Sequence, residues 1–262
     1  MESVSSPWII KPRSDVSAIG IRKVDHAEEV WRVIDEMNER ENLRERASYY
    51  LLARFIPGEV FHVDSLVNRG KVVFSGVNKY GRPPMQVAHQ GGAYISRTLL
   101  HGSSDEKSLT DINKKLVKTL KLDHGATHAE FIKSDTDGKF YFLEIAARVG
   151  GAYIADVLEA ASGISLWREW ARIEIANGVS STRIKPLRKE YAGIILSLAK
   201  QETPDTSAYN DEEIVYRIKK RHHAGVIVRS PNLERVNELL DGYALRFVDD
   251  FVAVVPPPER PE

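Results

Sequence analysis

One stretch of the sequence decides the fold, HAEFIKSDTDGKFYFLEIAAR at residues 128–148. Two apolar runs are joined by a short polar turn, which predicts a β-hairpin with a three-residue loop. If Asp135 pairs with Lys139, Glu130 lies directly opposite Glu144 on one face of the hairpin. Carboxylates opposed in this way have Cβ atoms about 4.5–5.5 Å apart and repel each other. A divalent cation between them is the usual reason for a protein to keep such a pair.

Side chains alternate across a strand, so the two faces of this hairpin differ. The face expected to pack a core holds Ala129, Phe131, Tyr141, Leu143 and Ile145. The charged face holds His128, Glu130, Ile132, Phe142 and Glu144, with Arg148 just beyond. A solvated face, with its acids neutralised by Lys or Arg from elsewhere, is the competing interpretation. A one-residue change in the loop, where Gly138 is expected to be left-handed, would also place the two glutamates on opposite faces.

The composition is that of an ordinary globular protein. The chain has 262 residues, 42% hydrophobic and 28% charged, which allows one large domain or two smaller ones. The formal net charge is zero, so no global field favours nucleic acid or an anionic membrane. The absence of cysteine excludes disulfides, thiolate catalysis and Cys-ligated metal sites, and it fits a reducing cytosol. The sequence shows neither a membrane span nor a signal peptide.

Periodicity and turn residues predict the remaining elements. Expected strands lie at 8–12, 21–24, 60–67, 71–77, 191–198 and 224–229. Expected helices follow an N-cap at Asp25 through about residue 39, and cover 109–121, most of 152–176, and 233–243 after Asn232. Residues 81–92 read as a loop, residues 177–181 as a linker, and residues 256–262 as a disordered tail.

Taken in order, several short motifs resemble the ATP-grasp superfamily, over about residues 8–175. They are Lys11-Pro12, the small-residue loop 14–20, the hinge run 51–59, His128-x-Glu130, and Glu144-x-Ala146-x-Arg148-x-Gly150-Gly151. The nearest resemblance is to the carboxylate–amine ligase branch, which is carbamoyl-phosphate-synthetase-like and L-amino-acid-ligase-like.

The resemblance implies an α+β fold with two α/β lobes around a nucleotide cleft and a small C-terminal α/β lobe. Its N-terminal part would be truncated. Residues 1–52 would be a remnant of the first lobe, residues 53–178 the second lobe with the Mg·ATP site, and residues 187–255 the C-terminal lobe. Residues 256–262 would form the tail.

The resemblance also implies an ATP site. Lys11 would contact the phosphates, and the loop containing Ser17 and Gly20 would close over them through its backbone N–H groups. The hinge would present backbone groups of Ala53 and Phe55 to adenine. Glu59 would bind ribose, with His62 as the fallback. The remaining residues assigned to the nucleotide are Arg54 and Ile132.

Glu130 and Glu144 would hold Mg²⁺, with Mn²⁺ as a substitute, because magnesium prefers hard oxygen ligands. The family often has asparagine where this chain has Ala146, which removes one oxygen ligand. Arg148 would stabilise the transferring phosphoryl group or bind an acceptor carboxylate. Gly150 and Gly151 would allow the backbone to approach the substrate closely.

The implied function is an ATP-dependent carboxylate–amine ligase that acts through an acylphosphate and releases ADP and phosphate. The alternative is a truncated or degenerate nucleotide-binding module that is not catalytic without a missing N-terminal part. The expected partners are a small-molecule carboxylate and an amine, with amino acids as candidates, and neither nucleic acid nor membrane. A homodimer or a separate N-terminal subunit and a cytoplasmic location complete the expectation.

Overall fold

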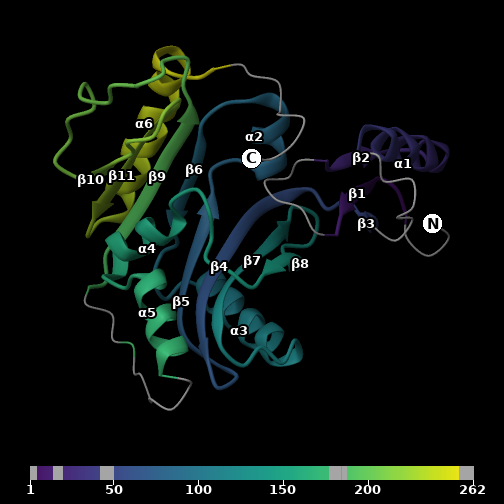
Figure 1. Cartoon of the computed structure of the whole chain (residues 1–262), viewed down its shortest axis with the longest axis horizontal. Helices are drawn as coiled ribbons and strands as arrows, with labels where there is room; N and C mark the ends of the chain where they lie inside the picture. The colour runs from purple at the N-terminus through teal and green to yellow at the C-terminus, as the bar shows by residue number, and fades with distance from the viewer. Residues whose placement is uncertain (1–4, 14–19, 42–49, 177–183, 185–187, 254–262) are drawn as a thin grey trace.

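The computed structural model describes residues 5–13, 20–41, 50–176, 184 and 188–253, and Figure 1 shows the whole chain. Ser17, the linker at 177–181 and the tail at 256–262 lie outside the described residues. Within the described part, no helix is long and apolar enough to cross a membrane.

The chain forms two sheets and six helices within its described residues. The strands are β1 Trp8–Pro12, β2 Arg22–Val24, β3 Tyr50–Arg54, β4 Gly58–Asn68, β5 Lys71–Tyr80, β6 Tyr94–Thr98, β7 Gly125–Ser134, β8 Phe140–Ala146, β9 Tyr191–Leu198, β10 Ile214–Arg217 and β11 His223–Ser230. The helices are α1 Ala27–Glu41, α2 Pro84–Gln90, α3 Ser104–Thr119, α4 Ile154–Ser162, α5 Leu166–Ile175 and α6 Leu233–Asp250.

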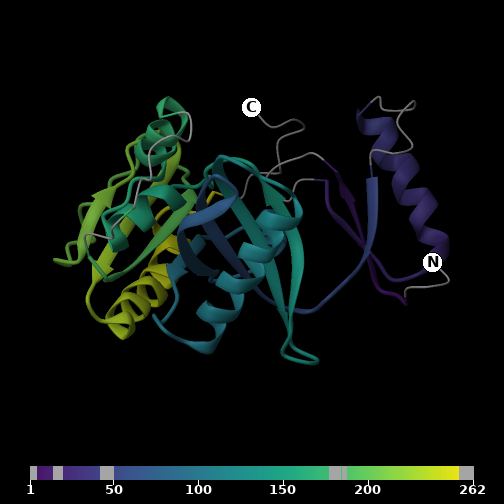
Figure 2. The same ribbon diagram turned by 90° about the horizontal axis from the view of Figure 1, so that it is seen from below.

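The smaller sheet has the order β2-β1-β3 and is fully antiparallel. Helix α1 covers it, because Val30, Val33 and Met37 on one side of the helix pack on Trp8 and Ile10 of β1. Figure 2 shows this N-terminal unit beside the main body, with β3 leading into β4.

The larger sheet has eight strands in the order β10-β11-β9-β6-β5-β4-β7-β8. Strand β9 pairs with β6, so the C-terminal strands continue the sheet formed by the central strands. The boundary expected at residue 187 stays a prediction, but the sheet runs without a break between elements on either side of it.

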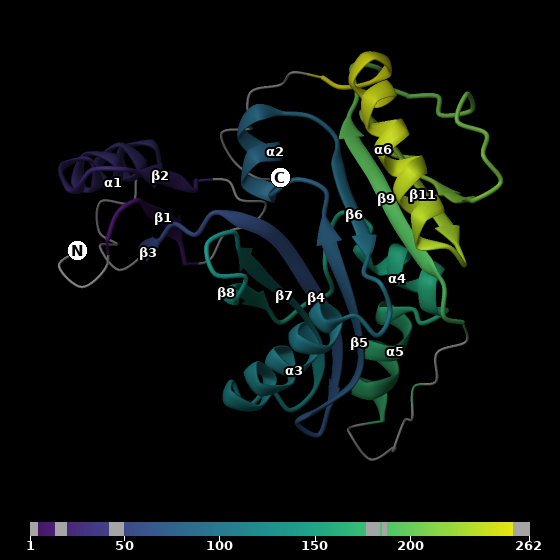
Figure 3. The same ribbon diagram turned by 180° about the vertical axis from the view of Figure 1, so that it is seen from behind.

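Helices cover both faces of the large sheet. On one face, α3 packs on Phe61 and Phe131, and α6 packs on Ile195 and Val226. Figure 3 shows these two helices on the near side of the sheet. On the other face, α4 and α5 pack against β4, β7 and β9, as Figure 1 shows. The second face also carries the polar residues described below.

The decisive hairpin is formed by β7 and β8, and Glu130 pairs with Glu144 as predicted. The path to that register differs from the expectation. Ser134 rather than Asp135 pairs with Lys139, which leaves a four-residue loop with Gly138 left-handed at φ 68°. A β-bulge then restores the predicted register, because Phe131 pairs with Phe142 and Leu143 is the extra residue.

The bulge corrects the predicted faces of β8. Phe140 packs in the core beneath α3, with its ring 5.4 Å from that of Phe61. Phe142 pairs with core-facing Phe131 but lies at the sheet edge and is 53% exposed. Tyr141 pairs with Ile132 and therefore belongs to the charged face. The expectation that Tyr141 packs the core and Phe142 lies on the charged face was wrong, since it assumed an uninterrupted ladder.

Three other segments also differ from the expected helices and loops. Residues 81–92 contain α2, which begins with Pro84 in its first turn. The helical segment at 152–176 breaks at left-handed Gly163 into α4 and α5. Helix α6 begins at its Asn232 cap as predicted but continues to Asp250, past Gly242.

Candidate active site

The register of the large sheet places a row of polar side chains across five strands. Glu144 of β8 lies opposite Glu130 of β7, and Glu130 lies opposite His62 of β4. His62 lies opposite Asn78 of β5, which in turn pairs with Thr98 of β6. All except Glu144 are buried. Buried polar groups are costly unless they are hydrogen-bonded, and within the described residues the side-chain amide of Asn78 has no partner, which makes this face the candidate site.

Asp64 is the centre of a hydrogen-bond network next to this row. It is fully buried, and its two carboxylate oxygens lie 2.6 Å from Nδ1 of His62 and 2.9 Å from Nδ1 of His128. Nε2 of His62 lies 2.7 Å from the Ser96 hydroxyl. Burial opposes ionisation of Asp64, but the charges and hydrogen bonds of the two histidines hold its pKa far below the ordinary value.

His128 carries a positive charge in this network. Burial works to lower its pKa, but the neighbouring Asp64 carboxylate outweighs burial and raises the pKa to about 10. Nε2 of His128 lies 3.4 Å from Oε1 of Glu130. Burial likewise works to raise the pKa of Glu130, and the bonds from His128 and Tyr80 lower it on balance. Glu130 is therefore an ionised carboxylate in a buried position.

Glu144 stands at the solvent side of the same row, with its side chain 55% exposed. Partial burial and the charge of Glu130 raise its pKa, although Lys11, His128 and Arg148 act in the opposite direction. The cation nearest to it in the described residues is Lys11, whose Nζ lies 4.0 Å from Oε2. Two carboxylates that face each other, one of which raises the pKa of the other, fit a divalent cation between them.

Lys11 joins the small sheet to this site. Its Nζ donates to the carbonyl oxygen of bulged Leu143 at 2.7 Å, and the residue is only 9% exposed. Arg148, at the start of the loop after β8, is exposed and donates to the carbonyl of Val149 at 3.0 Å. The structure thus brings Lys11, Glu130, Glu144 and Arg148 to one region, formed by residues far apart in sequence.

The two predicted glycines differ in their surroundings. Gly150 is buried, and a Cβ there would lie 2.6 Å from Oδ1 of Asp64 and 3.0 Å from Nδ1 of His128. Gly151 is exposed with nothing within 4 Å of a Cβ. Ala152 and Tyr153, which follow, are both left-handed, at φ 49° and 60°. Strained backbone of this kind is concentrated at functional sites.

The hinge strand β3 lies at the edge of the small sheet. The backbone N–H of Phe55 donates to the carbonyl of Pro7 at 2.9 Å, and Ala53 occupies the equivalent pairing position opposite Ile9. In an edge strand, the backbone N–H and C=O groups of every second residue point away from the paired strand. In β3 those of Arg54 point away from β1. The backbone groups of Ala53 and Phe55 are therefore directed toward β1, and their role toward adenine stays a prediction. The Arg54 guanidinium also lies 5.8 Å from the Tyr141 ring centroid.

The remaining predicted nucleotide residues are dispersed. Glu59 lies on the α3 side of β4 with its carboxylate 2.5 Å from Nζ of Lys79, so the structure does not bring it to Glu130. His62 is on the site face, but it is fully buried and both ring nitrogens are bonded. Ile132 is half-buried on the same face, two residues after Glu130. Gly20 is left-handed at φ 77°.

Sequence reasoning missed Asp64, Tyr80 and Ser96. Asp64 had a usable signal, because it follows His62 by two residues in an expected strand and so shares its face. Tyr80 gave no such signal, since it lay beyond the expected end of β5 and its partner Glu130 is 50 residues away.

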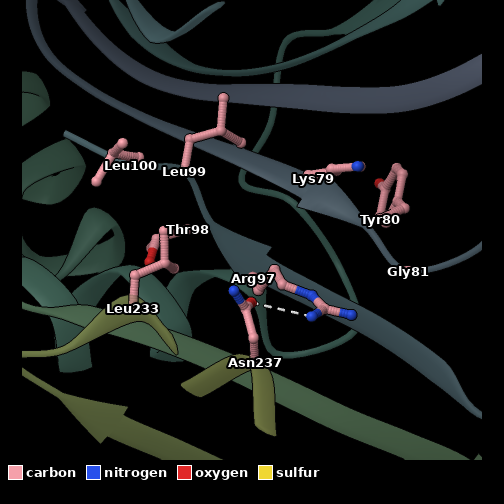
Figure 4. Close-up of a pocket in the computed structure, with 9 residues that line it drawn as sticks. All are labelled: Lys79, Tyr80, Gly81, Arg97, Thr98, Leu99, Leu100, Leu233 and Asn237. Carbon is pink, nitrogen blue, oxygen red and sulfur yellow. Dashed lines mark hydrogen bonds between the residues drawn. The ribbon is translucent and has the colours of Figure 1, made fainter. Parts of the chain in front are cut away.

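A separate cavity of about 270 Å³ lies on the opposite face of the sheet, between β5, β6 and the start of α6. Figure 4 shows Arg97 there, donating to Asn237 at 3.0 Å. Arg97 also pairs with Asp241, and Lys79 with Glu59. These two cations are already paired with carboxylates of the protein. The cavity is therefore a weaker candidate for a functional site than the buried polar row.

The chain is similar to known proteins in sequence and in fold. Residues 4–156 match the family model described as an ATP-grasp domain. The L-arginine-specific L-amino acid ligase of Bacillus subtilis is 26% identical over 179 residues, which make up 66% of this chain and 41% of that protein. The chain therefore spans less than half the length of this curated relative.

Solved structures share the fold. An L-amino acid ligase from Bacillus licheniformis superposes with a TM-score of 0.61 at 18% identity, covering 96% of this chain and 64% of the other. An N5-carboxyaminoimidazole ribonucleotide synthetase from Thermus thermophilus gives 0.68 at 16% identity, covering 97% and 64%. Phosphoribosylglycinamide synthetase from Anaerococcus prevotii gives 0.62 at 19% identity, covering 97% and 65%.

Proposed function

Because the chain belongs to the ATP-grasp family, we propose that it is an ATP-dependent carboxylate–amine ligase. The observation that carries the proposal is the pair Glu130 and Glu144, directly opposed in the sheet, with Lys11 4.0 Å from Glu144. This set of charges suits phosphoryl transfer, which needs positioning and charge neutralisation more than a protein nucleophile.

In the proposed reaction a substrate carboxylate oxygen attacks the γ-phosphorus of ATP, and ADP leaves. The amine then attacks the acyl carbon, phosphate leaves with the C–O electron pair, and the nitrogen loses a proton. Glu130 and Glu144 would hold Mg²⁺, or Mn²⁺ in its place, which neutralises phosphate charge when bound. Lys11 would bind the phosphates as a point charge, and Arg148 would bind the transferring group or the acceptor carboxylate.

Amino acids are the proposed substrates, because the curated relative is named as a ligase of L-amino acids with arginine specificity. The names of the relatives also favour a catalytic chain over a nucleotide-binding module without activity. A ligase that consumes ATP and contains no cysteine fits the cytoplasm.

The test combines binding and turnover. Calorimetry should show ATP binding that requires Mg²⁺, and Glu144→Ala should raise the Mg²⁺ concentration required or remove binding, because it removes a proposed metal ligand. Turnover is then measured as ADP release with pairs of amino acids, arginine included, one acting as acid and one as amine. ATP binding that is unaffected by Mg²⁺, or no ADP release across the whole panel, would contradict the proposal.

A further inference from the structure

Glu130 is held by the protein through one of its two carboxylate oxygens. The Tyr80 hydroxyl donates to Oε1 at 2.6 Å, and Nε2 of His128 lies 3.4 Å from the same atom. Among the described residues, no donor is bonded to Oε2. A carboxylate bonded in this way has a fixed orientation and one free oxygen, which is the arrangement a monodentate metal ligand needs.

The residues around Glu130 are themselves fixed. Asp64 accepts from Nδ1 of His128 at 2.9 Å, and the backbone of Gly150 passes so close that an added Cβ would lie 3.0 Å from the same nitrogen. The Tyr80 ring lies 4.6 Å from the ring of His62, which Asp64 also holds. Asp64 therefore restrains both neighbours of Glu130, the histidine by a direct bond and the tyrosine through His62.

We propose that Tyr80 and Asp64 are positioning residues that orient the Glu130 carboxylate for the divalent cation. Tyr80 acts by its direct bond to Oε1, and Asp64 acts through His128. The proposal rests on the proposed function, since it concerns the same Mg·ATP site. Loss of a partner that orients a metal ligand typically weakens metal binding by about 10–100-fold.

A different interpretation is that His62, Asp64 and His128 bind a separate metal ion. Ligand atoms of His62, Asp64 and His128 all lie within 4.8 Å of one another. The bonding argues against it, because Asp64 gives one oxygen to each histidine and Nε2 of His62 is bonded to Ser96. A metal ion would have to break these bonds in a fully buried position.

The experiment for Tyr80 is Tyr80→Phe, which removes only the hydroxyl. The measured quantity is the Mg²⁺ concentration that gives half-maximal ATP binding, obtained by calorimetry together with the thermal midpoint. Tyr209→Phe is the matched control, since its buried hydroxyl donates to the Asp250 carboxylate at 2.8 Å, far from the site. We expect Tyr80→Phe to raise the half-maximal concentration about tenfold, with excess Mg²⁺ restoring binding, and Tyr209→Phe to change it less than about twofold.

The experiment for Asp64 is Asp64→Asn, which keeps the shape and removes the charge. Ser65→Ala is its control, because Ser65 is equally buried on the same strand, faces α3 and accepts from Asn113 at 2.8 Å. We expect both changes to lower the thermal midpoint, but only Asp64→Asn to raise the Mg²⁺ requirement.

The outcomes separate the two proposals. If the wild-type protein binds ATP without need of Mg²⁺, the proposed function fails and this proposal fails with it. If the wild type needs Mg²⁺ but Tyr80→Phe and Asp64→Asn behave like their controls, only the positioning proposal is overturned. A tightly bound metal that copurifies in stoichiometric amount and is lost in Asp64→Asn would overturn it in favour of the separate metal site.

Discussion

Single residues at the site are constrained by close contacts rather than by charge alone. Gly150 shows this most directly, because its backbone passes against Asp64 and His128 with no room for a methyl group. Its φ does not lie in the left-handed region, so the requirement for glycine comes from space and not from backbone conformation. The backbone of Gly150, in the loop after β8, thus packs directly against the buried Asp64–His128 pair.

This contact gives a prediction for a single methyl group. Gly150→Ala should destabilise the protein by about 1–3 kcal/mol through overpacking and should raise the Mg²⁺ requirement for ATP binding, because the Asp64–His128 pair must shift. Urea unfolding and calorimetry check the two effects. Gly151→Ala is the control, since its Cβ would meet nothing within 4 Å. Equal effects of the two substitutions would contradict the steric account.

At the scale of elements, the bulge in β8 connects the hairpin to the rest of the site. It inserts Leu143 into β8, and the carbonyl of this residue accepts the Lys11 ammonium from the small sheet. Bulges re-aim groups next to active sites, and here the bulge also decides which aromatic residues reach the core. Phe140 faces α3, whereas Phe142 stays at the edge.

The different surroundings of Phe140 and Phe142 predict an unequal response of these two similar residues. Phe140→Ala should lower the free energy of unfolding by about 2–4 kcal/mol, because it removes a ring packed on Phe61. Phe142→Ala should cost less than about 1 kcal/mol, since the ring is 53% exposed. Urea unfolding measures both changes, provided that the dependence of the free energy of unfolding on urea concentration stays the same. A larger cost at Phe142 than at Phe140 would contradict the packed position of the Phe140 ring and the exposed position of the Phe142 ring.

At the scale of the whole molecule, the large sheet joins the central and C-terminal parts. Strand β9 pairs with β6 on one side and with β11 on the other, and Arg97 of β6 pairs with Asp241 of α6. A substitution that weakens the core beneath α6 should therefore lower the stability of the whole sheet. The effect should extend to α5, which carries Trp167 and Trp170.

Leu240 tests this continuity. It lies on the buried side of α6 and is fully buried, so Leu240→Ala should destabilise the protein by about 2–5 kcal/mol. If the sheet unfolds as one unit, tryptophan fluorescence and far-ultraviolet circular dichroism should shift to the same lower midpoint. Leu245→Ala on the same helix is the control, since Leu245 is 77% exposed and should change stability by less than about 0.5 kcal/mol. A fluorescence transition that does not move would indicate separately folding parts.

The sequence by itself determined the hairpin, the opposition of Glu130 and Glu144, and the order of motifs, because these depend on local alternation, turn residues and short spacings. It did not determine the bulge at Leu143, which moved Tyr141 and Phe142 to faces other than those predicted, or the face of Glu59 relative to Glu130. Only the tertiary structure decided that Asp64, Tyr80 and His128 meet around Glu130. Their strands are neighbours through long-range pairing, and no local pattern specifies which side chains such pairing brings together.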